Sequence, residues 1–256
     1  MPHLPSLADL VNAAKQDLPV TMRHERWLID GAQITPAAAH FAQQALTGKV
    51  GGARARQPLF RASGMGSCMR KQIFSRAGVA RREVIDGKTS NVFLTGNFIH
   101  LKWQVSGISA GWIKEAEVPV DRLDLNYGGT MDGVLDDDTG LEIKSINTRG
   151  FSMVTDRRKP TEEHMKQTTT YMILRNIDTF SVVYEDKNTQ EWKEFRIKKE
   201  PEYEDAVLSE MEVLNTVWNN THKLPGVKPN CQDKTGFEYN GCPFRNICPN
   251  IKEWPA

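Results

Sequence analysis

The chain has 256 residues, enough for one large domain or two small ones with a substantial core. Its charged fraction of 25%, hydrophobic fraction of 39% and net charge of +1 are ordinary for a globular protein, so no overall field indicates a nucleic-acid partner. No run approaches the ~18 apolar residues of a membrane span, and the N-terminus lacks the basic and apolar regions of a signal peptide. We therefore expect a cytoplasmic protein with no membrane partner.

Residues 1–60 are expected to form an N-terminal helical extension, and residues 61–256 one α/β domain. The extension's helices are predicted over 6–16, where Ser6 is a capping residue, and over 36–46, after Thr35. Hydrophobic spacing in the domain predicts helices over 66–77, 95–105, 160–176 and 201–220. Strands are predicted over 112–120, 127–135, 140–147, 179–184 and 191–197. This order indicates a central mixed sheet flanked by helices, followed by an irregular cysteine-rich tail from residue 224.

The segment between Gly129 and Ser145 carries the clearest chemical signal. Glu142 and Lys144 are two residues apart on a predicted strand, so their side chains share one face of the sheet. If the hairpin loop before them has an odd number of residues centred on Asp137, Asp132 lies directly opposite Glu142 on that face. The register therefore predicts two carboxylates and one ammonium on the same side of the sheet.

Such a trio suits hydrolysis of a phosphodiester. Mg²⁺ prefers oxygen ligands and is typically held by one or two carboxylates together with substrate phosphate. Asp132 and Glu142 would hold the ion, the Ile143 carbonyl could add a third oxygen, and Lys144 would position the attacking water or offset developing charge. A Glu-x-Lys pair alone is also common on exposed hairpins. The acidic turn from Asp136 to Asp138 is expected to be solvated rather than to bind metal.

Two further motifs flank this segment in the chain. Gly96-Asn-Phe-Ile-His100 precedes it, and Gln167-Thr-Thr-Thr-Tyr171 follows it. Taken in this order, the motifs resemble those of the PD-(D/E)xK nucleases, and specifically of their RecB-like branch. The resemblance implies a restriction-endonuclease-like core with His100 as a further metal ligand. Gln167 and Tyr171 are four residues apart on a predicted helix, so both can face the metal centre or the DNA. The proline that gives the family its name is replaced by Met131.

Four cysteines lie outside the predicted sheet: Cys68 before it and Cys231, Cys242 and Cys248 after it. A reducing cytosol disfavours disulfides, which leaves free thiols or a metal site. By ligand count, four thiolates suit Zn²⁺ and a [4Fe–4S] cluster equally well. The CRISPR-associated members of the branch hold a [4Fe–4S] cluster with one cysteine before the core and three after it. That resemblance implies a structural iron–sulfur clasp, although the gap from Cys231 to Cys242 is longer than in those members.

The resemblance implies a Mg²⁺- or Mn²⁺-dependent deoxyribonuclease. The branch favours exonucleases that act on single-stranded DNA or duplex ends in recombination, repair or replication. Arg70 and Lys71 of the predicted helix 66–77 are expected to contact the DNA together with Gln167 and Tyr171. Open alternatives are an endonuclease, the nuclease partner of a helicase, a homo-oligomer or partner of recombination proteins, and a non-catalytic DNA-end-binding module. No P-loop motif is present, which excludes a motor of that type.

Overall fold

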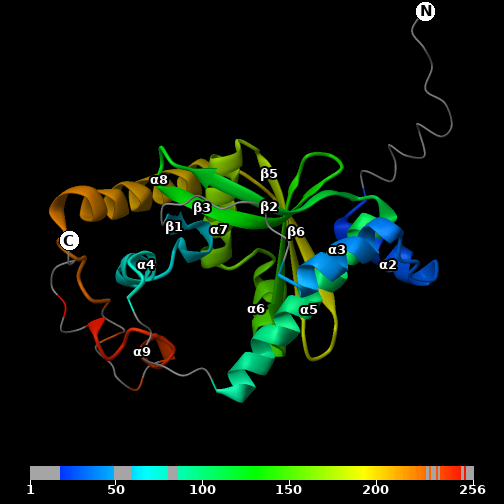
Figure 1. Cartoon of the computed structure of the whole chain (residues 1–256), viewed down its shortest axis with the longest axis horizontal. Helices are drawn as coiled ribbons and strands as arrows, with labels where there is room; N and C mark the ends of the chain where they lie inside the picture. The colour runs from blue at the N-terminus through cyan, green and yellow to red at the C-terminus, as the bar shows by residue number, and fades with distance from the viewer. Residues whose placement is uncertain are drawn as a thin grey trace, which may run out of the picture.

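The computed structural model describes residues 18–48, 59–79, 86–228, 231, 235, 237–248 and 251. The helix predicted over 6–16 lies outside these residues. Elements are labelled as in Figure 1. The α-helices are α2 (Val20–Ile29), α3 (Pro36–Leu46), α4 (Met69–Arg76), α5 (Gly87–Ala110), α6 (Thr148–Arg157), α7 (Glu162–Arg175), α8 (Pro201–Thr216) and α9 (Phe237–Asn240). The strands are β1 (Phe60–Arg61), β2 (Ile113–Arg122), β3 (Tyr127–Leu135), β4 (Gly140–Ile146), β5 (Thr179–Asp186) and β6 (Trp192–Lys198).

The strands of the described residues form one mixed sheet. The order β1-β3-β4-β5-β6 runs across it, and β2 pairs with β3 as well. β4 and β5 are parallel, whereas β2 with β3 and β5 with β6 are antiparallel. The expected central mixed sheet flanked by helices is therefore confirmed.

One edge of β3 is shared by two strands. β2 pairs along almost the full length of β3 on the other edge. On the shared edge, β1 pairs only with Tyr127 and Gly128, and β4 only with Gly133 and Val134. Residues 129–132 therefore have no strand partner on this edge within the described part of the chain. This gap in the sheet positions the candidate site.

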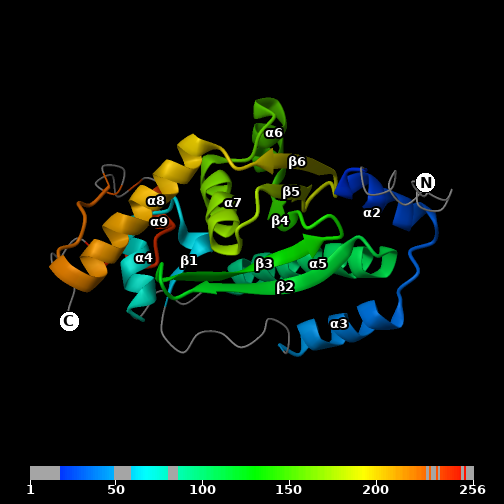
Figure 2. The same ribbon diagram turned by 90° about the horizontal axis from the view of Figure 1, so that it is seen from above.

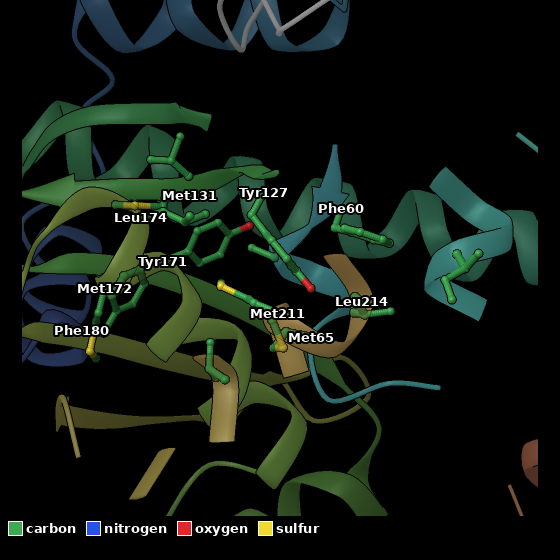
Figure 3. Close-up of a cluster of buried hydrophobic side chains, with 14 of the residues drawn as sticks. Phe60, Met65, Tyr127, Met131, Tyr171, Met172, Leu174, Phe180, Met211 and Leu214 are labelled. Carbon is green, nitrogen blue, oxygen red and sulfur yellow. The ribbon is translucent and has the colours of Figure 1, made fainter. Parts of the chain in front are cut away.

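Helices cover both faces of the sheet. α5 packs against β2, β3 and β4, and its Ile99 and Trp103 share one core with Leu141 and Ile143 of β4. α7 contributes to a larger core together with α8 and β3, part of which is shown in Figure 3. Side chains alternate along β4, so Leu141 and Ile143 point toward α5, whereas Glu142 and Lys144 point to the α7 side.

The N-terminal helices and the C-terminal segment lie at opposite ends of the sheet (Figures 1 and 2). α2 is anchored by His24, which stacks on Trp103 at a centroid distance of 4.0 Å and places Nδ1 2.7 Å from the hydroxyl of Ser106. Burial, reinforced by nearby Lys102, lowers the pKa of His24 to about 4. A neutral imidazole therefore joins α2 to α5.

Several elements differ from those predicted. α5 begins at Gly87 rather than near residue 95, because its first turns bury little apolar surface and so lack the expected periodicity. α2, α6 and β1 were not predicted; in α6 only Val154 is buried, although the Asn147 side chain caps its first turn. None of the described helices combines the length and apolar character that crossing a membrane requires.

Close packing of α5 on β2 leads to a stability prediction. A Cβ at Gly107 would overlap the side chain of Ile113 and lie 2.8 Å from Cζ3 of Trp112, both of which are buried. Gly107→Ala should therefore lower the free energy of unfolding by about 1–3 kcal/mol through overpacking, measured by urea denaturation. Gly87→Ala is the matched control, because nothing lies within 4 Å of its added Cβ. Equal stability of Gly107→Ala and wild type would contradict this packing.

Candidate active site

The β3–β4 hairpin has the predicted register. Gly133 pairs with Leu141 and Val134 with Gly140, so the turn is centred on Asp137. The same register would place Asp132 opposite Glu142, but the ladder ends one residue before that pair. The strands separate at the two carboxylates.

The acidic turn is held by ion pairs rather than left fully solvated. Asp136 pairs with Arg23 at 2.8 Å and Asp138 with Lys114 at 2.7 Å, while Asp137 pairs with Arg196. These contacts tie the hairpin to α2, β2 and β6. The turn carboxylates are therefore structural partners of neighbouring cations, consistent with the expectation that they do not form the metal site.

Asp132 lies where β3 and β4 separate, and only 9% of its surface is exposed. Its Oδ2 accepts the backbone N–H of Ile143 at 2.6 Å, and its Oδ1 lies 3.2 Å from Nδ1 of His100. Burial opposes ionisation, but His100 and the Ile143 N–H together lower the pKa of Asp132 below its ordinary value. Burial likewise opposes the imidazolium, yet the Asp132 carboxylate raises the pKa of His100. Asp132 is therefore held as an anion.

Glu142, Lys144 and Gln167 form a closed triangle of polar contacts. Glu142 Oε1 lies 2.6 Å from Lys144 Nζ and accepts a hydrogen bond from Gln167 Nε2 at 2.7 Å. Lys144 Nζ in turn donates to Gln167 Oε1 at 2.9 Å. Gln167 thus fixes the orientation of both charged groups. It can do so because Glu142 and Lys144 share the face of β4 that α7 covers.

Burial controls the charges of this triangle. Glu142 is 4% exposed, and burial raises its pKa to about 7 although Lys144 opposes the shift. Burial disfavours the Lys144 ammonium, but the adjacent Glu142 carboxylate outweighs it and raises the pKa of Lys144 above its ordinary value. Lys144 is therefore a cation at neutral pH, whereas Glu142 titrates close to neutrality.

The imidazole and carboxylates around the gap are donors of the kind that bind a divalent cation. Oε2 of Glu142 is buried and has no hydrogen-bond partner among the described residues. Neighbouring ligands of an octahedral ion with bonds of about 2.1 Å are about 3 Å apart, close to the separation of His100 Nδ1 and Asp132 Oδ1. As they stand, however, no three His, Cys, Asp or Glu side chains in the described ranges are gathered closely enough to hold an ion. Glu142 would have to turn its free oxygen toward Asp132.

Tyr171 belongs to the hydrophobic core (Figure 3), and its hydroxyl also borders the candidate site. Burial and the nearby charges of Glu142 and Asp132 raise the pKa of Tyr171, although a hydrogen bond with the Gln167 side chain opposes the shift. Tyr171 is 2% exposed, and its hydroxyl donates to the carbonyl of Thr130 at 2.8 Å, inside the gap of β3. A Cβ at Gly129 would come within 2.9 Å of the Tyr171 ring, so glycine is needed for this approach. Of the two helix residues predicted to face the site, Gln167 contacts Glu142 and Lys144 directly, and Tyr171 lies next to Gln167 where the site meets the core.

His164 was not among the predicted site residues. Its Nδ1 lies 2.6 Å from the hydroxyl of Tyr184. Burial, reinforced by nearby Lys144, lowers the pKa of His164 to about 3. The available signal was its position one turn before Gln167 on the same helix, which puts the two side chains on one face. A neutral His164 therefore borders the triangle without adding charge.

The four cysteines line a single cavity of about 350 Å³ between α4 and the C-terminal segment. All four are free thiols, and their sulfurs are not close enough together to hold a metal. Burial, aided by Cys68 and Cys242, raises the pKa of Cys248, although Arg70 opposes the shift. The structure thus brings the predicted ligands around one space.

Arg70 and Lys71 have different environments. Arg70 is 5% exposed; its guanidinium donates to the carbonyls of Pro225 at 2.9 Å and Cys248 at 2.6 Å, and to the carbonyl of Ile251. It therefore joins α4 to the C-terminal segment. Lys71 is exposed and lines both this cavity and a neighbouring one of about 300 Å³. Of this pair, only Lys71 has a side chain free to meet an external ligand.

Comparison with known proteins informs the fold. No protein-family model matches the chain, and no curated protein is significantly similar to it. LHK-Exo, an alkaline exonuclease from Laribacter hongkongensis, aligns at 20% identity over 63% of this chain and 90% of its own, with TM-scores of 0.48 for its dAMP complex and 0.45 without it. The crystal structure of SSO0001 aligns over 82% of this chain and 95% of that chain, with a TM-score of 0.53 and 16% identity. The chain has the same overall fold as SSO0001.

Proposed function

We propose that the chain is a divalent-metal-dependent nuclease of the PD-(D/E)xK superfamily, RecB-like branch, that hydrolyses phosphodiester bonds of DNA. The observation that carries the proposal is the buried, unpartnered Oε2 of Glu142, a side chain whose Oε1 contacts Lys144 and whose charge interacts with those of Asp132 and His100. A buried carboxylate with an unused oxygen is costly unless a cation or another donor completes it. The order of motifs along the chain supports the same family.

Asp132, Glu142 and His100 would hold Mg²⁺ or Mn²⁺, with the Ile143 carbonyl as the remaining candidate ligand. A bound ion of this kind supplies a water nucleophile at neutral pH and offsets charge on the phosphate oxygens. Lys144 is already protonated, so we assign it to neutralising charge on the phosphate and not to removing a proton. Gln167 orients Glu142 and Lys144. Tyr171 supports β3 from the core.

The substrate we infer is single-stranded DNA or a duplex end, degraded exonucleolytically during recombination, repair or replication. Lys71 and Gln167 would contact the strand, whereas the contacts of Arg70 with the C-terminal segment leave it a structural role. An endonuclease would use the same residues, and a non-catalytic end-binding module would lack turnover. Digestion of end-labelled single-stranded, duplex and circular DNA distinguishes the three, because an exonuclease leaves closed circles intact.

We also propose that Cys68, Cys231, Cys242 and Cys248 hold a [4Fe–4S] cluster, with Zn²⁺ as the alternative. Their shared cavity supports a common ligand, and the thiolates suit either group. The cluster would fasten the C-terminal segment to α4, next to the contacts that Arg70 makes. Its contribution would be structural, because the cavity is separate from the carboxylates.

The first catalytic prediction concerns the charged residues. Asp132→Asn, Glu142→Gln and Lys144→Met should each lower the cleavage rate at least about a hundredfold, because each removes a ligand or charge from the transition state. Asp138→Asn is the matched control, since this acid is exposed on the turn of the same hairpin. Circular dichroism would verify that each variant is folded. Near wild-type cleavage by all three site variants would contradict the assignment.

The second prediction concerns metal and pH. Excess EDTA should abolish cleavage, and Mg²⁺ or Mn²⁺ should restore it. Because protonated Glu142 must lose its proton to bind a cation, the concentration of Mg²⁺ needed for half-maximal cleavage should fall as the pH rises through about 7. Above that pH it should level off. Full activity in EDTA, or a metal requirement independent of pH over this range, would contradict the mechanism.

The third prediction concerns the cysteines. Replacing any one of the four with serine should lower thermal stability and solubility, because a shared cluster closes a very long loop and contributes to folding. Lys71→Gln, at an exposed residue of the same cavity, should leave both unchanged. Protein purified without oxygen should be brown and contain iron and sulfide in equal amounts. If the protein contains zinc but no iron, the bound group is Zn²⁺ rather than a cluster. If the protein contains neither metal, the proposed shared site is contradicted.

A further inference from the structure

The first turns of α5 present large apolar side chains to solvent. Phe93 is 56% exposed, with Val92 and Leu94 beside it. Within the described part of the chain, burial on α5 begins only at Ile99, so the turns before it extend beyond the sheet (Figure 1). An exposed cluster of this kind on a monomer commonly marks a binding surface.

Phe93 lies on the stripe of α5 that carries His100. Seven residues are close to two full turns, so the two side chains point in nearly the same direction and are about 10.5 Å apart along the axis. Gly96 lies between them on this stripe, and a Cβ there would be 3.1 Å from Oγ of Ser145, at the end of β4. The stripe therefore runs from the candidate site along the helix to Phe93.

Charge along this part of α5 is compatible with a polyanion. Residues 87–102 contain no acid; of their two lysines, Lys102 is paired with Glu185 at 2.7 Å, which leaves the charge of Lys88. A phosphate backbone that leaves the site along α5 would therefore meet no like charge on this segment. An aromatic ring in such a position offers a face on which any base can stack, and it does so without sequence preference.

Phe98 provides an internal comparison on the same helix. It is 51% exposed, close to the value for Phe93. It lies two positions before His100 in the sequence, which places it about 160° away around the helix axis. Its stripe continues through Leu101 and Val105, away from the carboxylates. The two phenylalanines thus match in type and exposure but differ in the direction they face.

We infer that Phe93 stacks on a base of a single DNA strand bound in the active site, within a few nucleotides of the scissile phosphate, because it lies about 10.5 Å along the helix axis from His100. The inference rests on the proposed nuclease function and adds to it a specific contact and a preferred substrate. Bases in a single strand have free faces, whereas those in a duplex are already stacked on their neighbours. Phe93 therefore favours single-stranded over duplex DNA.

The test is equilibrium binding of fluorescein-labelled single strands to the full chain in EDTA, which separates binding from cleavage. Phe93→Ala should weaken binding about 5- to 150-fold, the range for loss of one stacked base, while Phe98→Ala should bind like wild type. Phe93→Trp should retain affinity, because the larger ring also stacks. On a strand of abasic sites, which keeps the phosphates but lacks bases, wild type and Phe93→Ala should bind equally.

The outcomes are separable from those of the proposed function. If wild type neither binds nor cleaves DNA, the proposed function fails and the inference fails with it. If wild type binds and cleaves but Phe93→Ala and Phe98→Ala bind equally well, only the inference is overturned. The same conclusion follows if Phe93→Ala alters the oligomeric state measured by light scattering, since the apolar cluster would then serve a second copy of the chain.

Discussion

One hydrogen bond sets the geometry around which the site is built: the carboxylate of Asp132 accepts the backbone N–H of Ile143. In a continuous antiparallel ladder this N–H would meet a carbonyl of β3. With a side-chain acceptor in place, β4 separates from β3, and the shared edge of β3 opens between its two strand partners. The opening is filled from one side by α5 through His100, and from the other by α7 through Tyr171.

The two halves of the site keep their charges by different means. Asp132 stays ionised because a backbone donor and an imidazole face it, despite its burial. Glu142 has fewer donors for its second oxygen, so burial dominates and its pKa rises toward neutrality. Gln167 is uncharged and cannot neutralise Glu142 or Lys144, but its two hydrogen bonds hold both side chains in place. A buried ion pair with one unused oxygen contributes little to stability, which supports the proposal that the pair binds a ligand.

The sequence predicted most of what depends on local periodicity and pairing. The register centred on Asp137 and the limits of β3 and β4 followed from alternation and turn residues, and the cysteines proved to share a cavity. Tertiary contacts decided the rest. Arg70 is indistinguishable from a surface arginine until the C-terminal carbonyls are placed around it, and helical spacing alone does not show that Tyr171 is also part of the core. The helix at 148–157 has too few buried side chains to produce a periodic signal.

The contacts of Arg70 also impose an order on biosynthesis. Its carbonyl acceptors belong to residues 155 to 181 positions later in the chain, so α4 emerges from the ribosome long before they exist. At about 5–20 residues per second, roughly 10–40 s separate the two events. During that interval the strands from β2 to β6 emerge in turn and can pair, while the guanidinium of Arg70 stays hydrated and the thiol of Cys68 stays accessible. The end of the molecule containing α4 is therefore the last to close, and any group enclosed there has a defined period in which to enter.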